Sequence, residues 1–155
     1  MKQYPADKIF NVAVLGHSGA GKTTFVEAAL FNAGKINRMG RGEDGTLVAD
    51  FDEEEKRRHI TINTTATALE WNGSKLNLLD TPGEFDFLGE VQSALRVAGS
   101  ALILVNAKSG VEVGVDVDDD RVLVPGARLA EARVHDLAGG AVVDSVLGYR
   151  INQVD

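Results

Sequence analysis

Residues Gly16 to Thr24 have the types and spacing needed to bind a nucleoside triphosphate. The segment contains the pattern G-x-x-x-x-G-K-[ST] of a phosphate-binding loop. Glycines let such a loop curl so that successive main-chain N–H groups point inward at phosphate oxygens. Lys22 is placed to reach the outer phosphates, and the Thr23 hydroxyl is placed to coordinate Mg²⁺. The residues expected to bind the nucleotide here are Gly16, His17, Ser18, Gly19, Ala20, Gly21, Lys22, Thr23 and Thr24.

A strand before the loop and a helix after it must hold it in place, and the sequence predicts both. Residues 9–15 form an apolar run, as expected for a strand with helices over both faces of its sheet. Apolar residues at helical spacing follow over 24–32, and Gly34 is a natural stop. Glycine frequency alone would produce the motif by accident in about one chain in a hundred of this length. The flanking elements make an accidental match rarer still.

A second candidate group lies at the end of a predicted hairpin. Residues 60–71 predict a strand, Asn72-Gly73 is typical of a tight turn, and residues 75–80 predict the returning antiparallel strand. That strand ends in Asp80-Thr81-Pro82-Gly83. Taken alone, this is an ordinary turn sequence. Beside a phosphate loop, we expect Asp80 to support Mg²⁺ through water and Gly83 to let a main-chain N–H approach the terminal phosphate.

The remaining patterns predict a helix over 85–97 and a buried strand over 101–106. Strands that alternate with helices predict an α/β fold: a three-layer P-loop NTPase sandwich, its sheet mostly parallel with one antiparallel hairpin. The connection over 35–58 is polar and interrupted by glycines, and a connection this long is more often functional than inert. Its charged run, 50–58, predicts either a short helix or a solvated surface loop.

Composition excludes several other classes of protein. The 155 residues suffice for one domain with a sizeable core. A net charge of −7 gives no broad basic face, so no DNA partner is expected. The absence of cysteine excludes disulfides and thiol chemistry. The polar N-terminus and the lack of an apolar run near 20 residues predict a cytoplasmic monomer without a signal peptide or membrane contact.

Three segments together resemble the GTPase domain of translational elongation factor G and its paralogues: residues 16–24, 34–61 and 80–87. The middle segment resembles that family's long first switch region in order and spacing. The resemblance covers residues 8–114 and implies a Mg²⁺-dependent domain that binds GTP and GDP, hydrolyses GTP and works with the ribosome. It also implies that Thr23 and Thr61 coordinate Mg²⁺ in the triphosphate state, supported by Asp80, and that Gly83 contacts the γ-phosphate.

Three positions depart from the family's pattern. Gly19 stands in place of an acidic residue, His59 in place of a glycine, and Glu84 in place of the histidine that positions the attacking water. The resemblance therefore assigns catalysis to Lys22, Thr61, Gly83 and position 84. A carboxylate beside the γ-phosphate adds charge where charge must be neutralised, so Glu84 predicts slow hydrolysis. The alternative is a solvent-facing loop residue without a role.

The resemblance ends near residue 114. We interpret residues 1–114 as a truncated GTPase domain and 115–155 as an atypical tail, which either completes the sheet or is foreign in origin. The tail predicts a strand over 121–124, a helix over 125–137 and one or two strands within 141–151. The family's N-K-x-D motif, whose Asp reads guanine, is missing, so guanine specificity stays open.

Three functions are therefore compatible with the sequence. The leading one is a GTP-binding and GTP-hydrolysing domain of the elongation factor G type, with the activity of this truncated chain in doubt. The second is a nucleotide-dependent binding module that hydrolyses little and acts through its switch loops. The third is a P-loop ATPase whose tail supplies a different base pocket.

Overall fold

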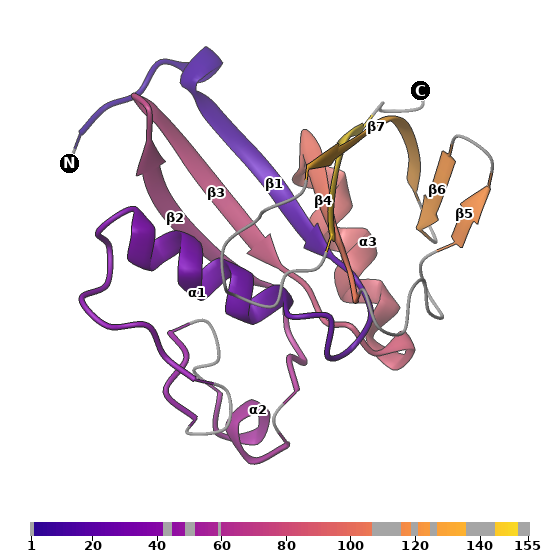
Figure 1. The fold of residues 1–155 in the computed structure, drawn as a ribbon, viewed down its shortest axis with the longest axis horizontal. Coiled ribbons are helices and arrows are strands. Elements are labelled where there is room, and N and C mark those ends of the chain that lie inside the picture. Colours follow the sequence, from indigo (N-terminus) through magenta and orange to yellow (C-terminus); the bar gives the residue numbers. More distant parts are fainter. Residues whose placement is uncertain are drawn as a thin grey trace.

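A mixed β-sheet with the strand order β2-β3-β1-β4-β8-β7-β6-β5 organises the fold (Figure 1). The computed structural model describes residues 2–41, 45–48, 52–58 and 60–106, together with the backbone of the strands between 116 and 151. Strand β1 (Ile9–Leu15) lies between β3 (Ser74–Asp80) and β4 (Ser100–Val105) and is parallel to both. The chain segment that precedes the phosphate loop is therefore a central strand.

The predicted hairpin consists of β2 (Thr65–Trp71) and β3, which pair antiparallel from Thr65↔Asp80 to Trp71↔Ser74. Its turn residues Asn72 and Gly73 both have positive φ, 47° and 76°, as a two-residue turn between right-twisted strands requires. The expected sheet of parallel strands with one antiparallel hairpin is confirmed over these four strands.

Helices cover the two faces of the sheet and make the three predicted layers. Helix α1 (Lys22–Asn32) packs on one face and α3 (Leu88–Val97) on the other. Successive side chains of a strand point to opposite faces, and β1 therefore contributes to two cores. Val14 packs with α1, whereas Ala13 and Leu15 pack with α3.

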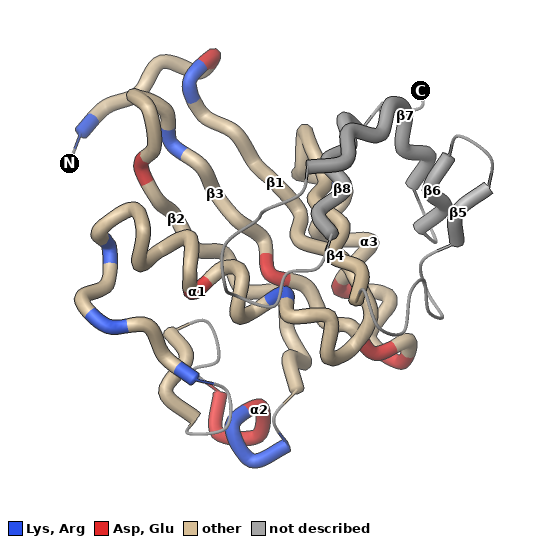
Figure 2. Tube along the Cα trace, viewed as in Figure 1, with Lys and Arg blue, Asp and Glu red and all other residues tan. Residues whose placement is uncertain are grey.

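The charged run in the long connection forms a short helix, α2 (Glu53–Arg58), which settles the alternative of an irregular loop. Its first three residues are acidic and its last three basic, so the charges complement the helix dipole at both ends (Figure 2). Two 3₁₀ turns complete the described part of the chain before β4: η1 (Ala6–Lys8) and η3 (Phe85–Phe87). None of the described helices is long and apolar enough to cross a membrane.

Two predicted elements begin more than two residues away from the observed ones. The strand expected from residue 60 begins at Thr65, because the preceding main-chain N–H groups of Ile62, Asn63 and Thr64 bond to carboxylates instead of a neighbouring strand. The helix expected over 85–97 divides into the η3 turn and α3.

The later strands are β5 (Asp116–Asp118), β6 (Arg121–Val124), β7 (Ala127–His135) and β8 (Ser145–Ile151). The predicted strands over 121–124 and within 141–151 are confirmed. The predicted helix over 125–137 is wrong, because residues 127–135 form β7, which pairs antiparallel with both β6 and β8. Strand β8 in turn pairs antiparallel with β4. Pairing with strands distant in sequence overrides the local helical pattern here.

Candidate functional site

The loop between β1 and α1 has the curled backbone that the motif predicts. Gly16, Gly19 and Gly21 all have positive φ, at 143°, 77° and 85°. At Gly16 a side chain is excluded twice, since a Cβ would also overlap the main-chain carbonyl of Leu104 in β4. Helix α1 begins directly after this loop, so its free N–H groups and the positive end of its dipole face the same space.

Lys22 lies beneath the loop with only 6% of its surface exposed. Its Nζ donates hydrogen bonds to the carbonyl oxygens of Gly16 (2.9 Å) and His17 (3.0 Å), which fixes the ammonium group inside the curl. Burial lowers the pKa of Lys22, and the negative charges of Asp80 and Glu84 act in the opposite direction. An anion at this position would stabilise the charged form of Lys22 that burial disfavours.

The strand order brings Asp80 and Gly83 to the same edge of the sheet. Asp80 ends β3, next to β1, and is fully buried. The Thr81 hydroxyl donates a 2.7 Å bond to the carbonyl of Val14, which fastens the turn to β1. A Cβ at Gly83 would overlap Lys22 Nζ and would lie 2.5 Å from the main-chain nitrogen of Ser18. Only glycine therefore permits this approach to the phosphate loop.

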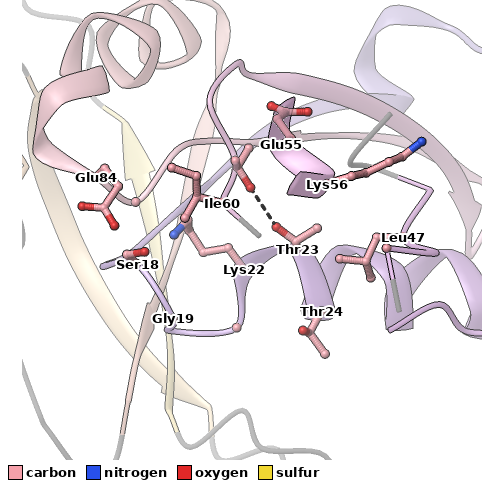
Figure 3. A pocket seen from close by; sticks show the side chains of 14 residues that line it. Ser18, Gly19, Lys22, Thr23, Thr24, Leu47, Glu55, Lys56, Ile60 and Glu84 are labelled. Carbon is pink, nitrogen blue, oxygen red and sulfur yellow. Dashed lines mark hydrogen bonds between the residues drawn. The ribbon is translucent and has the colours of Figure 1, made fainter. Parts of the chain in front are cut away.

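Thr23 and Thr61 come from distant parts of the chain and meet at the mouth of the site. Their hydroxyl oxygens lie 3.2 Å apart, and the dashed line in Figure 3 marks this contact. Hydroxyl oxygens are suitable ligands for a hard divalent cation. Glu84 and Lys22 lie together at one end of the same cavity (Figure 3).

One cavity contains most of the residues that the sequence singled out. Its lining consists of Ser18, Gly19, Gly21, Lys22, Thr23, Thr24, Gly45, Leu47, Glu55, Lys56, Ile60, Thr61, Gly83 and Glu84. Four predicted site residues do not line it. Gly16 and His17 accept bonds from Lys22, Ala20 packs into the core under α1, and the buried Asp80 exerts its charge on Lys22. His59 lies outside the described residues.

Sequence reasoning missed the carboxylates that hold the long connection before β2. Glu27 of α1 is fully buried and accepts main-chain N–H bonds from Gly40 (2.9 Å) and Val48 (3.0 Å). Glu55 of α2 and Glu90 of α3 accept similar bonds from residues 62–64. A glutamate within a helix gives no local signal of this role, because its partners lie 7 to 26 residues away.

Comparison with known proteins identifies the family. Residues 7–116 match the model of the elongation factor Tu GTP-binding domain. The chain belongs to this family. Over 105 residues it is 45% identical to the tetracycline resistance protein TetM of Enterococcus faecalis, a match that covers 68% of this chain and 16% of TetM.

Solved structures agree with this assignment to the elongation factor GTP-binding domains. A crystal structure of a Thermus thermophilus protein has a TM-score of 0.66 and 43% identity, over 68% of this chain and 16% of that one. A bacterial selenocysteine-specific elongation factor, at 20% identity and a TM-score of 0.55 over the same shares, supports the fold alone. The chain thus spans about a sixth of the length of these relatives. The resemblance to a translational GTPase domain and the predicted fold class are confirmed.

Proposed function

We propose that this chain is the Mg²⁺-dependent GTP- and GDP-binding switch domain of an elongation-factor-G-like translation factor. The observation that carries the proposal is the contact between Thr23 and Thr61, which joins the phosphate loop to the long connection at 3.2 Å. Two hydroxyls that meet in a cavity that Lys22 also lines suit a metal ion shared with phosphate oxygens.

Each residue then has a defined task. The main chain from Gly16 to Thr24 cradles the phosphates, and Lys22 neutralises their charge. Thr23 and Thr61 hold Mg²⁺, which would offset the charge that develops on the γ-phosphate, and Asp80 supports the ion through water. Gly83 brings its N–H to the γ-phosphate. Release of Thr61 after hydrolysis frees the long connection, a change between ordered and disordered states.

We propose further that Glu84 makes intrinsic hydrolysis slow, which favours the low-turnover binding module as a second function. Glu84 lines the cavity, and its charge acts on Lys22. A second carboxylate therefore lies where negative charge must be dispersed during phosphoryl transfer. A site that binds and orients GTP without accelerating its hydrolysis would leave the domain in its triphosphate state for longer.

Single-turnover hydrolysis of GTP tests this role. We expect Glu84→His and Glu84→Gln to hydrolyse GTP faster than the wild type, with and without ribosomes. Asp86→Asn is the matched control, because Asp86 is an exposed carboxylate of the adjacent η3 turn. Equal rates in all four proteins would remove the functional role of Glu84.

Base specificity is tested by competition, since the described residues include no N-K-x-D segment. We propose that the site prefers guanine, in line with the family of GTP-binding domains to which the chain belongs. Fluorescent GDP bound to the protein should be displaced by GTP and not by ATP or ADP at equal concentration. Equal competition by ATP would instead favour the ATPase alternative. Lys22→Ala, which removes the buried ammonium, should strongly weaken the binding of every nucleotide.

We propose the ribosome as the partner of the full-length protein, a cytoplasmic setting and a monomeric state. The relation to translational GTPases supports these assignments. We also propose that residues 1–114 form the GTPase unit and that the later strands complete its sheet. Co-sedimentation with ribosomes in the presence of a non-hydrolysable GTP analogue, compared with GDP, tests the partner directly.

A further inference from the structure

Glu55 is a buried carboxylate in a helix that is otherwise made of exposed or half-exposed charges. Only 1% of its surface is exposed, whereas its neighbours in α2 reach solvent. Burial of a carboxylate is costly unless hydrogen bonds compensate it. The position of Glu55 therefore calls for partners that a surface helix would not need.

Those partners are main-chain groups directly after Thr61. Glu55 Oε1 accepts the N–H of Ile62 at 2.9 Å and the N–H of Asn63 at 3.0 Å. The next residue, Thr64, donates its N–H to Glu90 Oε2 at 2.9 Å and its hydroxyl to the Glu90 carbonyl at 3.3 Å. Three consecutive residues that follow Thr61 are thus fixed by carboxylates of two helices.

This fixation determines where the Thr61 side chain can lie. A residue whose following peptide groups are bonded has few φ and ψ values left, and its side chain points in a defined direction. In the structure that direction leads to Thr23, 3.2 Å away between the two hydroxyl oxygens. Glu55 also lines the cavity itself, so this contact and the bonds of Glu55 occupy one wall of the site.

We propose that Glu55 is a positioning residue for Thr61 and thereby sets the preference of the site for triphosphate over diphosphate. The proposal depends on the proposed nucleotide switch. The Glu55 carboxylate already orders residues 61–63 before the nucleotide binds. Less of the binding free energy of the triphosphate is therefore lost in ordering this segment. A diphosphate, which does not reach Thr61 in this switch, gains nothing from Glu55.

The experiment compares three single variants of the full chain in Mg²⁺ buffer. Affinities for GDP and for a non-hydrolysable GTP analogue are measured by titration. We expect Glu55→Ala to weaken binding of the analogue about tenfold or more, as for a lost hydrogen bond to a charged group, and to leave the affinity for GDP unchanged. Glu55→Gln keeps a side-chain Oε1 acceptor and should therefore retain most of the wild-type affinity for the analogue. Glu54→Ala is the matched control, since Glu54 contacts Arg57 and Arg58 within the same helix.

A double-mutant cycle separates positioning from general stability. If Glu55 acts through Thr61, the variant with both Glu55→Ala and Thr61→Ala should bind the analogue no more weakly than Thr61→Ala alone. Additive losses, or equal losses for GDP and the analogue, would overturn the proposal. A wild type that binds GDP and the analogue equally would overturn it too, and a wild type that binds neither would reject the proposed function itself.

A second measurement does not depend on whether Glu55→Ala folds. In the wild type, amide hydrogen exchange at Ile62 and Asn63 should slow when the analogue and Mg²⁺ replace GDP, because binding at Thr61 and bonding to Glu55 are reciprocal. Exchange that is indifferent to the nucleotide would contradict the coupling.

Discussion

The hydroxyl oxygens of Thr23 and Thr61 lie 3.2 Å apart although 38 residues separate them in the chain. Thr23 is the second residue of α1, and Thr61 lies four residues before β2. The contact is the point at which the long connection returns to the phosphate loop. A ligand bound to both hydroxyls would therefore link two parts of the chain that the sheet alone does not join.

Replacement of Thr61 by alanine tests that link. We expect Thr61→Ala to weaken binding of a non-hydrolysable GTP analogue about tenfold in Mg²⁺, within the usual range of coupling energies, and to leave GDP affinity unchanged. Removal of Mg²⁺ by a chelator should make the wild type resemble the variant. Asn63→Ala, which alters an exposed side chain two residues later, serves as the control. An analogue affinity that is independent of Mg²⁺ would argue against a shared metal site.

The close approach of Gly83 to the phosphate loop predicts strong intolerance of a side chain. A Cβ at this position would overlap Lys22 Nζ and the main chain of Ser18, so Gly83→Ala must displace both of these groups or residue 83 itself. We expect loss of nucleotide binding, by at least about tenfold for a shift of roughly 1.4 kcal/mol. Gly89→Ala is the matched control, because a Cβ at Gly89 in α3 would have no atom within 4 Å apart from its chain neighbours and the backbone of its own helix. Similar affinities of the two variants for GDP would disagree with this geometry.

The lowered pKa of Lys22 predicts a fall of nucleotide affinity at alkaline pH. Burial lowers this pKa from 10.5, against the attraction of Asp80 and Glu84, and phosphate binds the protonated form. Affinity for GDP should therefore decrease as pH rises through the lowered pKa. The stability of the nucleotide-free protein depends on this group in the opposite way. Between the lowered pKa and 10.5 the unfolded chain binds more protons than the folded one, so the contribution of Lys22 to the free energy of unfolding rises with pH.

Titrations of GDP at increasing pH, below 10.5, measure the first effect. Lys22→Ala should bind GDP weakly, and its affinity should lack the part of the decrease that arises from deprotonation of Lys22. Ionisation of the base affects both proteins equally and cancels in the comparison. Parallel curves for the two proteins would mean that Lys22 does not titrate at the site.

The core under α3 predicts a clear difference between buried and exposed aliphatic residues. Ile103 of β4 is fully buried among Leu15, Leu95 and their neighbours, whereas Val97 at the end of α3 is 60% exposed. Ile103→Ala should lower the free energy of unfolding by about 2–5 kcal/mol. Val97→Ala should change it by less than about 0.5 kcal/mol. Urea unfolding of both variants provides the measurement, and equal midpoints would contradict this packing.

Local patterns were sufficient for most of the first 105 residues. Strand β1, the hairpin turn at Asn72-Gly73 and helix α1 depend on short-range periodicity and turn chemistry, which a sequence displays directly. The helix predicted over 125–137 failed because β7 pairs with β6 and β8, and such distant pairing leaves no local trace. For α2, composition alone was compatible with both a helix and a loop.

The candidate site likewise contains residues that the sequence reveals and residues that only the structure reveals. The phosphate loop is contiguous and could be found from its motif, and Asp80 and Gly83 followed from their place at a strand end. Glu27 and Glu55 could not be found, because their role depends on main-chain N–H groups brought to them by the fold. In the sequence Glu55 is one of three successive glutamates, and only the folded chain distinguishes it, by its burial and by its main-chain partners.

Helix α1 serves two parts of the molecule at once. Its first residue, Lys22, lies in the phosphate loop, and Glu27, one and a half turns later, holds the main chain at Gly40 and Val48. Eleven residues make a rod about 16 Å long, at 1.5 Å per residue. A displacement of this rod would carry the loop and both distant peptide groups with it as a rigid body. Residues 62–64 are bonded instead to Glu55 and Glu90 of the other two helices, so the rod would act on them only through the contact of Thr61 with Thr23.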